Sequence, residues 1–360
     1  MFTTGYTKKI LILTLLLLVG SLMSTGCAAK SGSSVPDNIK SPAQVKIGVI
    51  NSKALPPQVV VGFQKGTYKK VFPQVNFQLA LSKGHKDVAK NLAEGNWDFA
   101  YLGTGPAIEF TNYGFDQWGP AKYTIIAGAQ LGTNVLLTRP EVNRLSDLDG
   151  KTVGIANMNH DKEMLLNKLL AEAGLKSEPT GGTVKIKYGH TGMLYNEFIS
   201  GQIQAIYPLP SVIKVLKQDA GAKALSDGSE TEFGKNQTFA VFAVSNRFLK
   251  EYPEFTKGMI RVHVDNTELA QKNFNEIVEL TLAMETDFFK DDPRRVIPKA
   301  EIEQLYKRLE TTYDPNLNYL KETYRLLQKA KYINALPPFG EWADFTLLNQ
   351  VLQEKGLDPI

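Results

Sequence analysis

The sequence predicts an α/β protein with two lobes, each built on a doubly wound, mainly parallel sheet. Short β-rich runs alternate with helix-length stretches from Val45 onward, and the alternation starts again near Lys151. The chain has 360 residues, 43% of them apolar, which is enough for two cores. Because Cys27 is the only cysteine, those cores and not disulfides must stabilise the fold.

The first lobe is expected to open with strands and helices in alternation. Short runs rich in β-branched and aromatic residues predict strands, and longer runs with apolar residues at helical spacing predict helices. The strands are predicted at residues 45–50, 75–81, 99–102 and 123–129, and the helices at 57–72, 85–94 and 105–113.

The second lobe repeats this pattern, with strands at 151–156, 184–188 and 204–207 and helices at 161–173, 193–200 and 210–217. Gly174 ends the first of these helices. A polar stretch at 227–237 predicts a loop, and the β-rich run at 239–244 predicts the strand that returns the chain to the first lobe. Residues 130–138 and 237–244 are then the two crossing segments of a hinge.

The remainder of the chain is predicted to be mainly helical, at 253–283, 299–310, 316–330 and 341–355. These C-terminal helices carry charge on one face and apolar side chains on the other, which is typical of helices packed on a scaffold. The first lobe is therefore predicted to comprise residues 44–130 and 239–360, and the second lobe residues 131–238.

The N-terminus has the layout of a bacterial lipoprotein signal. Lys8 and Lys9 precede an apolar run at 10–19 that is too short to span a membrane, and small residues lead to Cys27. Residues 1–26 are predicted to be a signal peptide and 27–43 a flexible linker. The Cys27 thiol would carry a lipid that anchors the protein outside the cell membrane or in the periplasm. One departure is Ser24, where such signals prefer Leu, and the alternative is an incidental free cysteine.

Composition and motifs argue against several other classes of protein. A formal net charge of +4, which falls further when Lys8 and Lys9 leave with the signal, is too balanced for a nucleic-acid binder. The histidines other than His160 are scattered, so no metal site is predicted. No nucleophile elbow, phosphate-binding loop or zinc-protease motif occurs, so we predict no enzyme and no cofactor.

Three places where a strand meets a helix are candidate ligand contacts, because ligands of open α/β sheets bind at the carboxyl ends of strands. The first contains Gly103, Thr104, Gly105 and Ala107, with Pro106 suited to the first helical turn. Free amides at that helix N-terminus would attract an anion. The alternative is an ordinary helix-starting turn.

The second junction contains Asn157, Asn159, His160 and Asp161. The two asparagines either cap the helix or donate to an oxyanion, and Asp161 either caps it or pairs with a cationic ligand group. His160 is either a structural or a ligand-contacting histidine. At the third junction Tyr207 is either an aromatic wall of the site or a core residue.

The loop after the first strand adds Asn51 and Ser52, polar side chains that could reach into a cleft between the lobes.

Three segments, residues 98–107, 145–155 and 244–254, resemble the ABC-transporter substrate-binding proteins for nitrate, aliphatic sulfonates and taurine. The first reads Asp-Phe-Ala-Tyr-Leu-Gly-Thr-Gly-Pro-Ala, and the similarity extends over about residues 45–272. The resemblance implies a type II periplasmic binding protein fold and a monomer that binds a small anionic or zwitterionic solute between its lobes. It also implies delivery to a membrane permease with its ATPase, and ligand contacts at Asn51, Ser52, the 103–107 turn, Gln130 and the 157–161 turn.

The turn at 157–161 is more polar and acidic than the Gly and Ser run of the sulfonate binders. The ligand therefore stays open among a sulfonate, an amine-bearing ligand such as taurine, a phosphonate and a heterocycle. The role also stays open, because a sensor or a cofactor-independent enzyme could use the same fold. Eukaryotic thiamine-pyrimidine synthases use a related fold, but their cysteine-rich motif is absent from this sequence.

Overall fold

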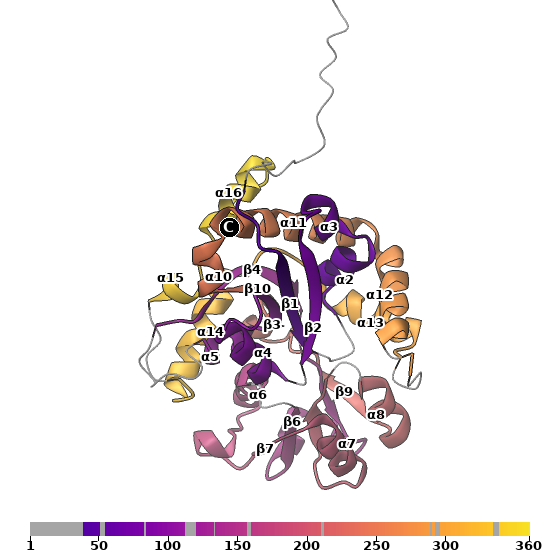
Figure 1. Cartoon of the computed structure of the whole chain (residues 1–360). Coiled ribbons are helices and arrows are strands. Elements are labelled where there is room, and N and C mark those ends of the chain that lie inside the picture. Colours follow the sequence, from indigo (N-terminus) through magenta and orange to yellow (C-terminus); the bar gives the residue numbers. More distant parts are fainter. Residues whose placement is uncertain are drawn as a thin grey trace, which may run out of the picture. The chain divides into compact units, whose positions relative to one another are not determined.

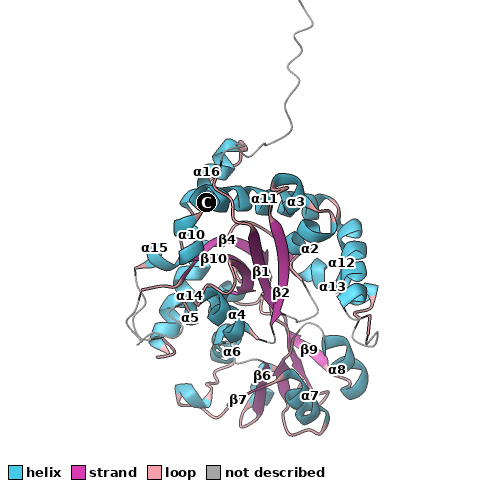
Figure 2. Cartoon of the chain, viewed as in Figure 1, coloured by secondary structure: helices cyan, strands magenta, loops and turns pink. Residues whose placement is uncertain are grey.

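A computed structural model describes residues 39–50, 55–82, 84–111, 120–132, 134–156, 160–209, 212–288, 290–291, 296–333 and 338–360. The chain divides into the units Met1–Asn38 and Ile39–Ile360, and all described residues belong to the second unit. Within that unit two separate sheets are flanked by helices (Figure 1; Figure 2). The predicted signal segment, including Cys27, lies outside the described residues.

The first sheet has six strands in the order β11-β4-β10-β3-β1-β2. Strand β1 pairs in parallel with β2 and β3, whereas β10 runs antiparallel between β3 and β4. The bounds are β1 (Gln44–Ile50), β2 (Asn76–Ser82), β3 (Phe99–Gly103), β4 (Tyr123–Leu131), β10 (Thr238–Ser245) and β11 (Glu310–Thr311).

The second sheet has the order β7-β6-β8-β5-β9, in which β6 pairs in parallel with both neighbours and β5 is antiparallel to both of its own. The α/β class of the prediction is confirmed, and the antiparallel strands make both sheets mixed. The bounds are β5 (Leu136–Thr138), β6 (Thr152–Ala156), β7 (Lys185–Gly189), β8 (Ala205–Tyr207) and β9 (Lys223–Ser226).

Helices pack on both sheets, and several differ from the prediction. The expected helix at 57–72 is two, α2 (Pro57–Gln64) and α3 (Thr67–Val71), because Gly66 adopts a φ of 64°. The predicted loop at 227–237 contains α9 (Glu232–Lys235), whose N-terminal amide from Gly234 is capped by Thr231. The expected helix at 253–283 is also two, α11 (Pro253–Lys272) and α12 (Phe274–Phe288).

The remaining helices lie close to their predicted positions, except that α10 was not predicted and that the last predicted helix is α15 and α16 with a break between them. Their bounds are α4 (His85–Ala93), α5 (Thr104–Glu109), α6 (His160–Glu172), α7 (Thr191–Ile199), α8 (Ile213–Ala220), α10 (Asn246–Glu251), α13 (Lys299–Arg308), α14 (Leu317–Lys329), α15 (Phe339–Trp342) and α16 (Thr346–Glu354). Among the described helices, none is long and apolar enough to cross a bilayer.

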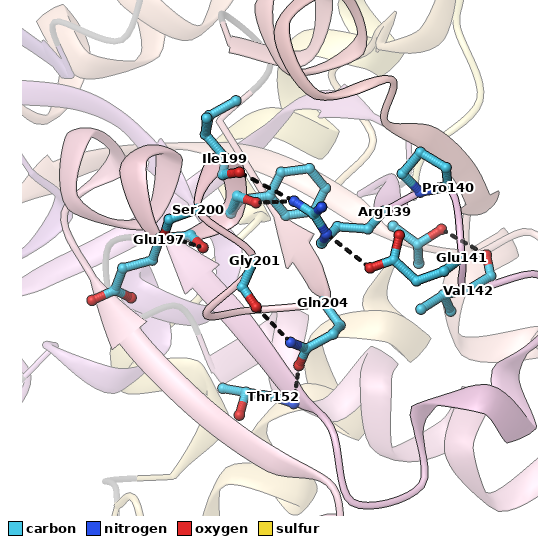
Figure 3. Close-up of polar contacts among 12 residues, drawn as sticks. Arg139, Pro140, Glu141, Val142, Thr152, Glu197, Ile199, Ser200, Gly201 and Gln204 are labelled. Atoms are coloured by element: carbon cyan, nitrogen blue, oxygen red, sulfur yellow. Dashed lines mark hydrogen bonds and ion pairs between the residues drawn. The ribbon is translucent and has the colours of Figure 1, made fainter.

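Arg139 fixes helix α7 onto the second sheet. Its guanidinium donates to the carbonyls of Phe198 (2.7 Å) and Ile199 (3.2 Å) at the end of that helix, and to the Glu141 carboxylate (Figure 3). A cation at a helix C-terminus is favourable, because the last carbonyls have no partner within the helix. The end of α7 is therefore fixed beside the end of β5.

A buried polar chain sits beneath the first sheet. His263 Nε2 donates to the Gly128 carbonyl (2.8 Å), so its Nδ1 accepts from the Tyr101 hydroxyl (2.9 Å). Burial lowers the pKa of His263 to about 4, so the ring is neutral at physiological pH. The Phe242 ring stacks on Tyr101 and His263, which fixes Tyr101 on the central strand β3.

Gln58 joins three segments of the first core. The two hydrogens of its Nε2 are shared among three acceptors, the carbonyls of Ala129 (2.9 Å) and Thr312 (3.1 Å) and the Thr267 hydroxyl (3.1 Å). Replacing Gln58 with Leu would leave the buried Thr312 carbonyl without its donor. We expect Gln58→Leu to lower the free energy of unfolding by about 1–3 kcal/mol.

Urea unfolding measures this change. Gln64→Leu on the same helix is the control, because Gln64 is exposed and should shift stability by less than about 0.5 kcal/mol. Equal effects of the two substitutions would contradict the role of Gln58.

Candidate ligand-binding site

A cavity of about 70 Å³ lies where residues of the two sheets meet. This volume exceeds the roughly 10–15 Å³ that one water requires, so the cavity has room for several water-sized groups. Residues of the first sheet and its helices form one wall of the cavity. The other wall comes from the second sheet and its helices and contains Ala156, Asp161, Lys162 and Leu209. The polar lining groups are His85, Tyr101, Gly103, Gln130, Asn134, Asp161, Lys162 and Gln237.

Asp161 joins the start of α6 to the start of α5. Its Oδ2 accepts the Gly105 amide hydrogen at 2.7 Å. A Cβ added to Gly105 would lie 1.8 Å from Asp161 Oδ1, so only glycine permits this approach. Burial raises the pKa of Asp161 to about 7; Glu109 adds to that rise, and the Gly105 hydrogen bond, His160 and Lys162 oppose it.

Lys162 places a buried cation beside that carboxyl group. Its side chain is 3% exposed, and Nζ uses one of its three hydrogens to donate to the Pro208 carbonyl at 3.1 Å. Burial lowers the pKa of Lys162 to about 8, Asp161 opposes the shift and Arg308 adds to it. A cation in the first turn of a helix also faces the positive end of the helix dipole. An anion in the cavity would therefore stabilise charged Lys162.

His85 is held as a neutral imidazole at the opposite wall. Its Nδ1 accepts the Gly103 amide hydrogen at 3.2 Å, so the other ring nitrogen carries the proton and is a donor. Burial lowers the pKa of His85 to about 3, and nearby Lys162 lowers it further. The ring thus offers a neutral donor and adds no charge.

Two glutamines bring unpaired polar atoms to the cavity. Gln130 is 3% exposed and Gln237 is 2% exposed. Among the described residues, Gln130 Nε2 and Gln237 Oε1 have no hydrogen-bond partner. Buried polar atoms are nearly always paired, so these two groups fit a solute that both accepts and donates hydrogen bonds.

The structure brings together some of the residues predicted from the sequence. Gly103, Gln130 and Asp161 line one cavity, and Gly105 contacts it through Asp161. Asn51, Ser52, Asn157 and Asn159 lie outside the described residues, so their contacts remain predictions.

Other predicted residues contact protein groups instead and do not line the cavity. The Thr104 hydroxyl donates to the Thr238 carbonyl (2.7 Å), and the Ala107 carbonyl accepts from the Tyr123 hydroxyl (2.8 Å). His160 pairs with Glu109 at 2.7 Å, and the Tyr207 side chain is fully buried.

His85, Lys162, Asn134 and Gln237 were not among the predicted site residues. A local signal existed for Lys162, which directly follows Asp161 and puts a lysine in the first turn of a helix, where the dipole disfavours it. Within the described residues, no three His, Cys, Asp or Glu side chains form a group that could hold a metal ion.

The raised pKa of Asp161 predicts a pH dependence of stability. The folded state binds the Asp161 proton more tightly than the unfolded chain, whose Asp pKa is about 4. The stability that this bound proton contributes is therefore lost as pH rises from about 4 to about 7. Asp161→Asn retains an acceptor for Gly105 without the charge. Relative to wild type, its free energy of unfolding should rise over that range by up to about 4 kcal/mol, at about 1.4 kcal/mol per pKa unit.

Urea unfolding at several pH values between 4 and 8 tests this expectation. Asp87→Asn, at an exposed position in the first turn of α4, is the matched control. If the difference between Asp161→Asn and wild type does not change with pH, the proposed ionisation of Asp161 is wrong.

Solved structures share this fold at low sequence identity. The alkanesulfonate-binding protein SsuA from Xanthomonas axonopodis pv. citri, bound to MOPS, is 18% identical with a TM-score of 0.65, covering 84% of this chain and 99% of that one. The periplasmic nitrate-binding protein NrtA from Synechocystis PCC 6803 is 12% identical with a TM-score of 0.68, covering 88% and 90%. The desulfurization enzyme DSZB is 14% identical with a TM-score of 0.60, covering 86% and 99%.

These similarities confirm the predicted type II periplasmic binding protein fold and the resemblance to sulfonate- and nitrate-binding proteins. No curated protein matches the chain in sequence. The sequence pattern of the NMT1-like family matches residues 39–282, more than half of the chain. The protein therefore belongs to the NMT1-like family.

Proposed function

We propose that the protein is an extracytoplasmic solute-binding protein of an ABC importer and not an enzyme. It binds a small anionic or zwitterionic solute in the cavity between the two sheets and delivers it to a membrane permease with its ATPase. The observation that carries this proposal is the buried Lys162 ammonium, which lines the same cavity as the unpaired Gln130 and Gln237 amide groups.

The charges around the cavity favour an anionic group on the solute. Lys162 lies near a second cation, the partly buried Arg308, whose pKa burial lowers while Asp227 partly opposes that effect. Desolvated cations are stabilised by an anion that accepts hydrogen bonds from them. A sulfonate, nitrate or phosphonate group supplies such an acceptor.

Asp161 extends the choice to zwitterions. Its carboxyl group lines the cavity next to Lys162, so a solute with an ammonium group, as in taurine, could place its two ends on the two side chains. Two alternatives for the ligand are a phosphonate and a heterocycle, and the purified protein would then bind that compound. Two alternatives for the role are a sensor and an enzyme on the same fold, and only the enzyme would convert the bound compound.

Binding in this cavity implies closure of two lobes. The chain passes from the first sheet to the second between β4 and β5, and returns between β9 and β10. We propose that these crossings act as a hinge between a first lobe (residues 44–130 and 239–360) and a second lobe (131–238).

The contribution of Lys162 can be measured directly. Native mass spectrometry of the purified protein identifies a co-purified solute, and calorimetry with taurine, ethanesulfonate and nitrate provides defined probes. We expect Lys162→Gln to weaken binding of the preferred anion about 10- to 150-fold, which corresponds to a lost charge-assisted hydrogen bond of about 1.5–3 kcal/mol.

Lys217→Gln, at an exposed position of α8, should leave the affinity unchanged. A co-purified solute without an anionic group, or unchanged affinity in Lys162→Gln, would contradict the proposed solute class. Conversion of the bound solute to a product would favour the enzyme.

The proposal includes a lipid anchor on Cys27 of a monomeric protein, supported by the signal-like residues before this cysteine. We expect Cys27→Ala to abolish incorporation of a labelled fatty acid in cells while the purified domain keeps the wild-type melting temperature. Equal labelling of the wild type and the variant would show that Cys27 is not the anchor.

A further inference from the structure

The C-terminal segment at residues 299–333 lies beyond the part of the chain that matches the family. It contains α13, β11 and α14. Strand β11 attaches it to the first sheet by pairing with the end of β4, where Thr311 lies opposite Gln130. The same segment contributes Leu309 to the cavity wall. It is therefore joined to the ligand-binding side of the first sheet.

Helix α14 also reaches the second sheet. It packs on α5, which begins at the end of β3 of the first sheet, and on α6, which follows β6 of the second (Figure 1). Its amphipathic pattern alone predicts packing on the first lobe, as expected above. The observed position is at the junction, in contact with helices from both sides.

Tyr332, just after α14, contacts side chains of α6. Its hydroxyl lies 2.6 Å and 2.5 Å from the two carboxylate oxygens of Glu163, a residue of α6 that is 2% exposed. Its ring stacks on His160, with centroids 3.7 Å apart and planes at 10°. Glu163 also accepts from the Tyr188 hydroxyl of β7. Tyr332 thus touches two side chains of the second sheet's first helix.

Two ion pairs extend the contact along the segment. Glu322 of α14 lies 3.7 Å from Lys168 of α6, and Glu301 of α13 lies 3.4 Å from Lys214 of α8. Because these pairs are partly exposed, each contributes little. The buried contacts of Tyr332 therefore dominate the attachment.

We propose that residues 299–333 form a strap that holds the two lobes in the closed arrangement, with Tyr332 as its latch on Glu163 and His160. The strap is fixed to β4 at Gln130 and docks on the second lobe through Tyr332. Release of the latch would increase the open population and raise the apparent Kd for a solute in inverse proportion to the closed fraction that remains. This role does not depend on which solute is bound.

The lone cysteine makes the strap testable by spin labelling. In a Cys27→Ser background, Lys70→Cys on α3 and Lys217→Cys on α8 place labels at exposed positions beside the two sheets. Electron–electron distance measurements are made on protein freed of co-purified solute by refolding from urea. Tyr332→Phe removes the hydroxyl and retains the ring, and Tyr332→Ala removes both.

Tyr324→Phe is the matched control, because Tyr324 lies on α14 within the same segment and its ring packs against Trp342. We expect a single short distance for the wild type and the control, and an added longer component for Tyr332→Phe that grows in Tyr332→Ala. If the longer distance is seen in Tyr332→Ala but not in Tyr332→Phe, the stacking of the Tyr332 ring on His160, and not its hydroxyl, is the contact that holds the strap.

A wild type that already shows the longer distance without solute overturns the strap. So do folded Tyr332 variants, checked by circular dichroism, whose distances equal those of the wild type. Either result leaves the proposed solute-binding function intact, because that function is measured separately by calorimetry with the defined anions.

Discussion

The contact between the Asp161 carboxyl group and the Gly105 amide governs the architecture of the site. It places the start of α6 against the start of α5, two helices that follow strands of different sheets. The absent side chain of Gly105 is what makes the approach possible. Because the Asp161 carboxyl group accepts this amide hydrogen, the Gly105 amide of the α5 turn is already paired, whereas Lys162 and Gln130 line the cavity.

The site places a carboxyl group and an ammonium group, Asp161 and Lys162, next to each other in the first turn of α6. Burial raises the pKa of Asp161 to about 7 and lowers that of Lys162 to about 8, so near neutral pH Asp161 is partly protonated while Lys162 remains mostly charged. Two ionisable groups so placed respond strongly to a charge brought in by a solute. His85 and the two glutamines add hydrogen-bonding groups without charge. Such groups distinguish the orientation of a bound molecule more than its net charge.

The positions of strand ends, and with them Gly103 and Asp161, follow from local sequence patterns, since β-rich runs and helix starts are short-range features. The contacts across the cavity do not, because Asp161 meets Gly105 over 56 positions and His85 meets Gly103 over 18. Thr104 and Ala107 sit in the predicted turn, yet they bond to Thr238 and Tyr123 in the first core. A junction predicts where a site lies, but not which side chains of its helix face it.

The C-terminal helices show the same limit at a larger scale. An apolar stripe on a helix predicts that it packs on something, and α14 does bury Tyr319, Leu320 and Leu327. The stripe contains no information on Glu322 within the helix or on Tyr332 just after it, and these two residues contact α6 of the second sheet. The contacts between the helices that follow the two sheets therefore include polar and aromatic side chains outside that stripe, such as Tyr332 on Glu163 and His160.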